Sequence, residues 1–290
     1  NGWLPRPSWF EQMEGWSGSV YLPWERWLMG HPRCRAVFPR DAFTARILQR
    51  WAIPTYDLGN PMMDGLEPTG QLPLLPPADP TLPSLTLLLL PGSRAPEAYA
   101  NWRLILQAVA SVQQHLHGRS LRFLAAIAPG LDLTVLQQDL QTVQWQPGND
   151  SGSGHPDASV RPTSNSSLIF TAGTASLVLT QAHFSDCLHY ADVAIALAGT
   201  ATEQMVGLGK PVVTFPGGGP QFTPAFAETQ TRLLGPSVVM VSHPQQVGDA
   251  IASLINDPER LQQIAQNGRS RLGQPGAAGR IAQCLLQQFI

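Results

Sequence analysis

The sequence predicts an α/β protein with a parallel, Rossmann-like sheet, joined to the closing part of a second domain of the same kind. Two observations support this fold class. Residues 85–90 (LTLLLL) form a continuous apolar run, which is typical of a strand buried on both faces of a sheet. This run and several later ones are separated by small, polar turns and by segments with apolar residues at helical spacing. That alternation indicates βαβ units.

Composition narrows the class of protein further. Of the 290 residues, 43% are hydrophobic and only 13% are charged, as in a globular protein with a lightly charged surface. The formal net charge of −2 provides no basic footprint, so we expect no nucleic-acid partner. The three cysteines lie far apart and favour a reducing compartment without disulfides, so we expect a cytoplasmic protein. No apolar run reaches the length of a membrane span.

Residues 1–68 are expected to be the last portion of an N-terminal domain. Strands at 34–40 and 55–58 flank a helix over 42–51 that Asp41 caps, which is part of a βαβ pattern. A nucleotide-binding domain typically needs about 100 residues or more, so we expect its beginning to lie outside this sequence.

Tryptophan is concentrated at the start of the chain, where five of the eight tryptophans fall within the first 30 residues. We interpret them as packing between loops and short helices. The alternative is an aromatic surface for a partner or for peripheral contact with the inner membrane, because indole suits such an interface.

Residues 69–83 carry five prolines without periodicity and are expected to link the domains. The second domain, 84–290, then alternates strands and helices, and residues 146–166 are polar enough to suggest a mobile loop or insertion. We expect strands at 85–90, 121–127, 168–170, 177–180, 193–197 and 237–241, and helices over 96–117, 131–140, from 200, after Pro244, after Asp257 and over 276–289.

The first candidate binding loop is Gly92-Ser93-Arg94, between the strand at 85–90 and the next helix. In an open parallel sheet, ligands bind beyond the carboxyl ends of the strands. Glycine lets the backbone approach a ligand, Ser93 can donate a hydrogen bond, and Arg94 can bind phosphate in a bidentate manner. The alternative is a plain strand-to-helix turn with a solvated arginine.

The second candidate is the turn at Gly199-Thr200-Ala201, together with Glu203. A helix that begins here would present backbone N–H groups to phosphate, and Glu203 would accept hydrogen bonds from ribose hydroxyls. Alternatively, Thr200 and Glu203 form a capping box that satisfies the same N–H groups. These two interpretations compete for Glu203.

The third candidate is the loop Gly217-Gly218-Gly219-Pro220-Gln221. Three successive glycines permit backbone shapes that other residues do not adopt, and Gln221 can both donate to and accept from sugar hydroxyls. A flexible loop is the alternative. No catalytic set of nucleophile, histidine and carboxylate is legible by spacing, and we expect neither a bound metal nor a cofactor.

Taken in order, these loops resemble the C-terminal half of GT-B glycosyltransferases, and in particular lipid A disaccharide synthases. The resemblance covers most of the chain, although each motif is short. It rests on the segments LPGSR (90–94) with Glu97, AGTATE (198–203), GKPVV (209–213), the Gly-rich PQ loop up to Gln221, and GNPMMD (59–64) as the close of the first domain.

The resemblance implies a hexosyltransferase whose second domain binds a UDP-sugar of the UDP-N-acetylglucosamine type as donor, with a lipid-linked sugar as acceptor. It places Arg94 and the N–H groups of 199–201 on the diphosphate, Glu203 on the ribose and Gln221 on the sugar. The backbone near Phe184 would meet the uracil. Such transferases work without a bound metal, so a helix dipole and an arginine stabilise the leaving diphosphate.

In this fold the acceptor site and the catalytic base come from the N-terminal domain, of which only the last portion is expected here. No base is therefore identified, and we expect this chain to bind UDP or a UDP-sugar but to transfer sugar poorly. Two alternatives remain. One is a UDP-sugar 2-epimerase of the same fold, although such enzymes usually carry a serine pair where this chain has residues 199–202. The other is a non-catalytic nucleotide-sugar-binding module.

Overall fold

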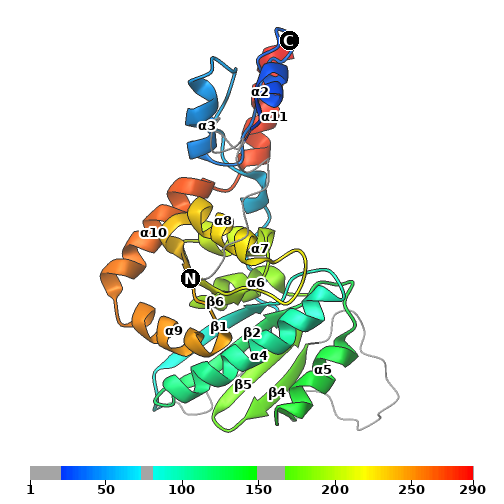
Figure 1. Cartoon of the computed structure of the whole chain (residues 1–290), viewed down its shortest axis with the longest axis vertical. Helices are drawn as coiled ribbons and strands as arrows, with labels where there is room; N and C mark the ends of the chain where they lie inside the picture. Colours follow the sequence, from blue (N-terminus) through cyan, green and yellow to red (C-terminus); the bar gives the residue numbers. More distant parts are fainter. Residues whose placement is uncertain (1–20, 73–80, 149–166, 290) are drawn as a thin grey trace, which may run out of the picture. The chain divides into compact units, whose positions relative to one another are not determined.

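The structure is a computed structural model that describes residues 21–72, 81–148 and 167–289 (Figure 1). Its contacts divide the chain into two units, Leu66–Arg269 and a second made of Asn1–Gly65 with Ser270–Ile290. We expected the second domain to run to residue 290, but the last segment groups with the first part of the chain instead. Within the described ranges, none of the helices combines the length and the apolar character that crossing a membrane requires.

The larger unit contains one mixed sheet, in the order β3-β4-β5-β2-β1-β6-β7-β8 for the described residues. The run from β5 to β8 is parallel, and β3 and β4 add antiparallel strands at one edge. The strands are β1 (Ser84–Leu90), β2 (Ser120–Ala126), β3 (Gln146–Pro147), β4 (Leu168–Ala172), β5 (Ala175–Thr180), β6 (Val193–Ala196), β7 (Val212–Thr214) and β8 (Val238–Met240).

Helices cover both faces of this sheet, which explains why its central strand is apolar at successive positions. Leu87 and Leu89 of β1 belong to the core formed with α4 (Glu97–His115), α5 (Leu133–Thr142) and α9 (Val247–Ile255). In Figure 1, α4 and α5 lie across the front of the sheet. Leu88 is equally buried but points the other way, toward the face where α6 (Phe184–Tyr190) and α7 (Thr200–Gly207) pack. The predicted α/β class is confirmed.

The remaining helices of this unit lie toward the end of the chain. They are α8 (Pro224–Leu234), the short 3-10 turns η2 (Gly235–Ser237) and η3 (Pro244–Gln246), and α10 (Pro258–Leu272), which reaches into the last segment. Neither α6 nor α8 was predicted as a helix. Much of the polar stretch at 146–166 lies outside the described residues, so the expected insertion there is not tested.

The order of strands reverses at β1. From β1 the chain forms β2 and then β3 at the edge of the sheet, and it comes back through β4 to β5 beside β2. It then crosses to the other side of β1 to form β6, β7 and β8. At such a switch point the loops that follow two neighbouring parallel strands diverge and leave a crevice at their carboxyl ends. Leu90 of β1 pairs with Ala196 of β6, so the loops after these two strands start side by side.

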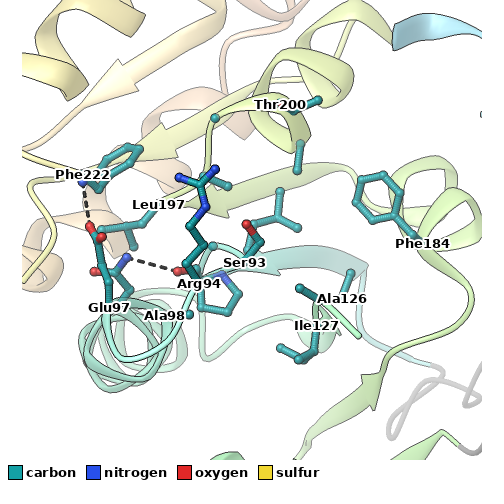
Figure 2. A pocket seen from close by; sticks show the side chains of 18 of the residues that line it. Ser93, Arg94, Glu97, Ala98, Ala126, Ile127, Phe184, Leu197, Thr200 and Phe222 are labelled. Atoms are coloured by element: carbon teal, nitrogen blue, oxygen red, sulfur yellow. Dashed lines mark hydrogen bonds between the residues drawn. The ribbon is translucent and has the colours of Figure 1, made fainter. Parts of the chain in front are cut away.

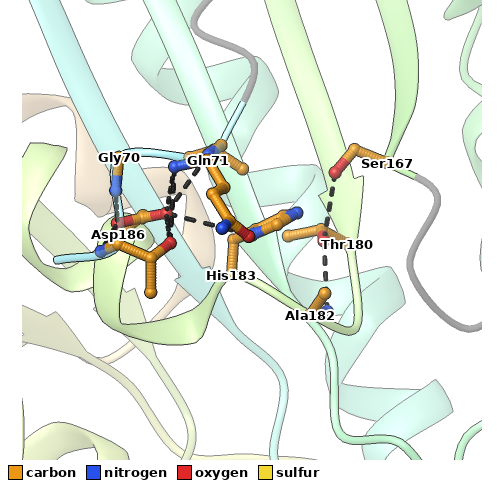
Figure 3. A network of polar contacts seen from close by, with 9 residues as sticks. Gly70, Gln71, Ser167, Thr180, Ala182, His183 and Asp186 are labelled. Carbon is orange, nitrogen blue, oxygen red and sulfur yellow. Dashed lines mark hydrogen bonds and ion pairs between the residues drawn. The ribbon is translucent and has the colours of Figure 1, made fainter.

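The described part of the expected linker is anchored to the larger unit. The side chain of Asp186 in α6 is fully buried, and its carboxylate accepts hydrogen bonds from the backbone N–H groups of Thr69, Gly70, Gln71 and Leu72 (Figure 3). Residues 69–72 are therefore held by α6 of the larger unit. Four of the five prolines of the expected linker lie in residues outside the described ranges, and the fifth is Pro83.

The smaller unit is mainly helical in its described part. It contains α2 (Pro23–Met29), α3 (Ala42–Gln49), the 3-10 turn η1 (Pro61–Met63) and α11 (Ala277–Phe289). Asp41 caps α3 as predicted, since its carboxylate accepts the Thr44 N–H at 2.7 Å. The strands expected at 34–40 and 55–58 are wrong in extent: they meet only in one parallel bridge between Val37 and Thr55. A strand pair needs further strands to extend it.

The GNPMMD segment connects the two chain segments of this unit. The carboxylate of Asp64 accepts hydrogen bonds from the N–H groups of Gly276, Ala277 and Ala278, at the start of α11. These bonds, led by that from Ala278, lower the pKa of Asp64, although burial opposes them. Arg280 adds a hydrogen bond of 2.9 Å to the Leu58 carbonyl. Residues 1–20, with Trp3, Trp9 and Trp16, lie outside the described ranges, so the aromatic surface stays a prediction.

Candidate functional site: a pocket at the carboxyl ends of the parallel strands

A pocket of about 690 Å³ lies at the carboxyl edge of the sheet (Figure 2). Its walls come from the loops that follow β1, β2, β5, β6 and β7, and from the first residues of α4, α6 and α7. This volume is within the range of small-molecule sites, and its position is the one expected for a ligand in an open parallel sheet. The pocket belongs entirely to the Leu66–Arg269 unit.

The structure brings most of the predicted site residues together around this pocket. Glu203 and Gly219 are the exceptions, because neither is among the residues that line it. The predicted residues that do line it are Gly92, Ser93, Arg94, Phe184, Gly199, Thr200, Ala201 and Gln221. Their common location is a finding, whereas the ligand contacts assigned to them remain predictions.

Arg94 and Gln221 lie on the rim, although they are far apart in the sequence. The Arg94 guanidinium donates a hydrogen bond of 3.1 Å from Nη1 to Oε1 of Gln221, and both side chains are exposed. An exposed guanidinium keeps most of its donors available to a ligand. This pair joins the first and third predicted loops.

The turn after β1 requires its glycine. Gly92 has a φ of +100°, and a Cβ at this position would lie 3.2 Å from the carbonyl oxygen of Leu197, at the end of β6. A side chain would be disfavoured both by the backbone conformation and by this contact. Gly92 therefore lets the loops after β1 and β6 approach each other closely.

The second predicted loop starts α7, but not through a capping box. The N-cap is Gly199, and no side chain caps it. The first intrahelical donors are the N–H groups of Thr202 and Glu203, which both bond to the Gly199 carbonyl. The N–H groups of Thr200 and Ala201 precede these bonds at the pocket wall, where a helix start favours an anion. The capping-box alternative is wrong because the helix begins one residue earlier than it requires.

Glu203 lies in the first turn of α7 and is mostly buried. Because it does not line the pocket, a contact with ribose would need a small movement of α7 or of the side chain. Gln204, the next residue, does line the pocket and was not predicted. The sequence pattern predicted that the first turn of α7 belongs to the site. Which of the neighbouring side chains, Glu203 or Gln204, lines the pocket is seen only in the structure.

A glutamine from α8 holds the turn before α7. The Gln230 amide donates hydrogen bonds of 3.1 Å and 3.3 Å to the carbonyls of Ala198 and Gly199, and the side chain is buried. The same two carbonyls also accept hydrogen bonds from the first turn of α7, so Gln230 ties α8 to the start of this helix. The role of Gln230 is not predictable from local sequence, because α8 itself was not predicted.

The glycine-rich loop is held by the first turns of α4. Glu97 and Asn101 are both buried and both accept hydrogen bonds from backbone N–H groups of the loop. Gly219 packs directly against this helix: a Cβ there would lie 2.3 Å from Cγ of Glu97. Position 219 therefore requires a glycine because Glu97 packs against it.

The far end of the pocket is less polar. Figure 2 shows Phe184 on the side of the pocket opposite Glu97 and Phe222, with Ala126 and Ile127 nearby. The loops that follow β2 and β5 are joined here by Gln181, whose amide donates hydrogen bonds of 3.0 Å and 2.7 Å to the carbonyls of Ala128 and Leu131. This end can enclose a flat, weakly polar group.

Other polar residues of the motifs lie away from the pocket. The Lys210 ammonium donates to the carbonyls of Leu188, His189 and Ala191 at the end of α6, which makes it a structural residue. Burial lowers the pKa of Lys210, although nearby Asp192 opposes this. His183 lies 3.9 Å from Asp186, outside the pocket lining. In the described ranges, no three His, Cys, Asp or Glu side chains gather in a way that suits a metal ion.

No family model matches this sequence, and no curated protein is similar to it. Solved structures are similar to its fold. A Listeria monocytogenes protein assigned as a UDP-N-acetylglucosamine 2-epimerase matches with a TM-score of 0.55 and 15% identity, over 87% of this chain and 59% of that one. The UDP-GlcNAc 2-epimerase from Neisseria meningitidis, bound to UDP-GlcNAc, matches with a TM-score of 0.51 and 15% identity, over 87% and 62%.

The S. aureus MnaA–UDP co-structure matches with a TM-score of 0.53 and 15% identity, over 87% of this chain and 60% of that one. This chain thus spans about three fifths of the length of each structure. At such low identity the likeness shows the fold alone. Over most of its length, the chain has the Rossmann-like α/β architecture of GT-B type proteins.

Proposed function

We propose that the pocket binds a UDP-sugar, with the diphosphate between Arg94 and the start of α7. One observation carries the proposal: a guanidinium and a helix N-terminus meet at the switch point of a parallel sheet. Arginine binds phosphate oxygens through paired N–H donors, and a helix start offers backbone N–H groups with a favourable dipole. Ser93 lines the same pocket and can add a further donor.

The two ends of the pocket support one orientation of this ligand. The Phe184 end, with its small and apolar neighbours, suits the uracil ring. The opposite end carries the amide of Gln221, which can donate to and accept from sugar hydroxyls. Solved structures of similar fold contain UDP or UDP-GlcNAc. This similarity supports UDP-N-acetylglucosamine as the first ligand to test.

Transfer of the sugar to an acceptor hydroxyl is the first candidate reaction. The hydroxyl oxygen would form a bond to the anomeric carbon while the bond to the diphosphate breaks, and a base would take the hydroxyl proton. Arg94 and the start of α7 would stabilise the charge that develops on the leaving diphosphate. A lipid-linked sugar is the acceptor class that we propose, from the resemblance to lipid A disaccharide synthases.

No side chain of the pocket is suited to be the base in this reaction. Glu97 is the one carboxylate among the lining residues, and backbone N–H groups occupy it. We therefore propose that the acceptor site and the base lie outside this pocket.

Inversion of the sugar at C2 is the second candidate reaction. It is favoured by the 2-epimerase structures, which match this chain over most of its length. The two reactions are separated by their products. An epimerase converts UDP-N-acetylglucosamine to UDP-N-acetylmannosamine without an acceptor, which proton NMR of the anomeric region detects. A transferase releases UDP only when an acceptor hydroxyl is present.

Calorimetric titration with UDP tests the binding site itself. We expect Arg94→Ala to weaken UDP binding by about 10- to 100-fold, as expected for lost hydrogen bonds to a charged group. Arg119→Ala is the matched control, because Arg119 directly precedes β2 and so lies at the amino ends of the parallel strands, away from the pocket. Equal UDP affinity in the Arg94→Ala variant and the parent chain would exclude the proposed diphosphate position.

A further inference from the structure

We propose that Glu97 is a positioning residue, which holds the loop Gly217–Phe222 in the shape that carries Gln221 to the sugar end of the pocket. The proposal rests on the proposed function, because it assigns a role within the same site. It also predicts that Glu97 restricts the motion of this loop when no ligand is bound. The sequence pattern alone treats the loops at 92–94 and 217–221 as separate motifs.

The carboxylate of Glu97 is bonded to the loop at its C-terminal end. Both of its oxygens lie 3.1 Å from the backbone nitrogen of Gln221, and Oε1 also accepts the N–H of Phe222 at 2.6 Å. Figure 2 shows the contact with Phe222 on the side of the pocket near Leu197. Hydrogen bonds from backbone donors to a buried carboxylate are strong, so they fix the course of the loop at these two residues.

Asn101, one turn further along α4, holds the other end of the loop. Its Oδ1 accepts the N–H of Gly218 at 3.2 Å, and its amide donates to the carbonyl of Pro91 at 3.1 Å. The loop is also closed on itself, since the N–H of Gly217 donates to the carbonyl of Phe222 at 3.0 Å. Two neighbouring helical positions thus hold both ends of a loop that would otherwise be free to move.

These contacts assign Glu97 to positioning rather than to chemistry. A carboxylate has about four lone-pair positions, and three of its hydrogen bonds are made to the loop. The loop in turn presents Gln221 to the rim, where its Oε1 meets Arg94 at 3.1 Å. Glu97 therefore affects a ligand indirectly, through the position of Gln221.

The consequence for the ligand is specific to its sugar. Gln221 is the pocket residue placed by this loop at the end where the sugar is proposed to bind, whereas Phe184 and the start of α7 belong to other elements. Loss of the Glu97 contact should therefore weaken binding of a UDP-sugar more than binding of UDP. A purely structural role would lower thermal stability without separating the two ligands.

Two glycines provide a pair of test and control variants that leaves the carboxylate in place. A Cβ at Gly219 would lie 2.3 Å from Cγ of Glu97, so Gly219→Ala forces the loop and the side chain apart. A Cβ at Gly118 would meet no atom within 4 Å, so Gly118→Ala makes the same substitution outside the loop and without disturbing Glu97. The second pair is Glu97→Gln with Glu259→Gln, since Glu259 is exposed in α10.

Two measurements on the full chain test the proposal. Hydrogen–deuterium exchange reports the amides of residues 217–222, and calorimetry gives the affinities for UDP and UDP-N-acetylglucosamine. For Gly219→Ala and Glu97→Gln we expect faster exchange in this loop. We also expect about tenfold weaker binding of the UDP-sugar, the value of one lost hydrogen bond or slightly more, with less than about threefold change for UDP. Both control variants should match the parent chain.

Unchanged exchange in both test variants would overturn the proposal, and so would equal losses of affinity for UDP and the UDP-sugar. If Glu97→Gln fails to fold, the comparison of Gly219→Ala with Gly118→Ala still decides. A parent chain that binds neither ligand would refute the proposed function alone, because the exchange measurement is made without ligand.

Discussion

Asp186 accepts two hydrogen bonds from Thr69, one from the backbone N–H at 2.5 Å and one from the hydroxyl at 2.7 Å, across 117 positions of the sequence. Three further N–H groups, those of Gly70, Gln71 and Leu72, point to the same carboxylate (Figure 3). Residues 69–72 belong to no helix or strand, so the Asp186 carboxylate takes the place of the backbone carbonyls that would otherwise accept their N–H groups. It also anchors the start of the larger unit to α6, whose first residue, Phe184, lines the pocket.

This arrangement predicts that Asp186 contributes to stability in a pH-dependent manner. Burial alone would raise the pKa of its carboxyl, but hydrogen bonds from Thr69 and from the N–H groups of Gly70 and Leu72 outweigh burial and lower the pKa to about 2. The folded state thus binds the proton less tightly than the unfolded chain does. The contribution is complete above the ordinary value of 3.8 and is lost as the pH falls toward about 2.

Asp186→Asn should therefore lower the free energy of unfolding by about 2 to 3 kcal/mol at neutral pH, with a smaller difference from the parent chain as the pH approaches 2. Urea denaturation over this pH range measures the difference. Asp57→Asn is the control, because Asp57 is exposed. A constant difference between variant and parent at every pH would contradict the assignment.

Glu203 can be tested by removing its proposed partner from the ligand. If its carboxylate accepts hydrogen bonds from ribose, Glu203→Ala should weaken UDP binding by about tenfold, whereas binding of 2′,3′-dideoxy-UDP should be the same in variant and parent. Calorimetry with both ligands gives the four affinities needed. Glu228→Ala on α8 is the control. A lower melting temperature with unchanged UDP affinity would instead assign Glu203 a structural role.

The turn at Gly92 predicts a combined loss of stability and affinity. Gly92→Ala places a side chain at a positive φ and near the Leu197 carbonyl, and we expect it to cost about 1 to 2 kcal/mol. Because the same turn carries Ser93 and Arg94, UDP affinity should fall as well. Gly118→Ala is the matched control, since a Cβ there would meet no atom within 4 Å. If Gly92→Ala and Gly118→Ala have the same melting temperature and the same affinity for UDP, the proposed role of the turn is refuted.

Much of the larger unit follows from local sequence patterns. The apolar run at 85–90 predicts β1 because a strand covered on both faces needs no polar alternation. The meeting of Arg94 with the start of α7 follows from topology, since both come directly after neighbouring parallel strands. Eight predicted site residues were brought together by this rule, which requires no knowledge of the ligand.

Other features depend on contacts that no local pattern reveals. Glu97 begins a helix, as acidic residues often do, and nothing in its neighbourhood indicates a loop more than a hundred residues away. Gly219 was assigned to the approach of a ligand, but the close neighbour is Glu97. The sequence at 34–40 has the composition of a strand, yet strand length is set by available partners, and Val37 pairs only with Thr55.

The hydrogen bonds between Asp64 and residues 276–278 have a consequence for the order in which the protein is made. They join an early segment to one that leaves the ribosome more than 200 residues later. The Leu66–Arg269 unit can fold as soon as it has emerged, because its contacts lie within one continuous stretch. The smaller unit must wait for α11, so a nascent chain that ends before that helix would carry a formed pocket in the larger unit and an incomplete smaller unit.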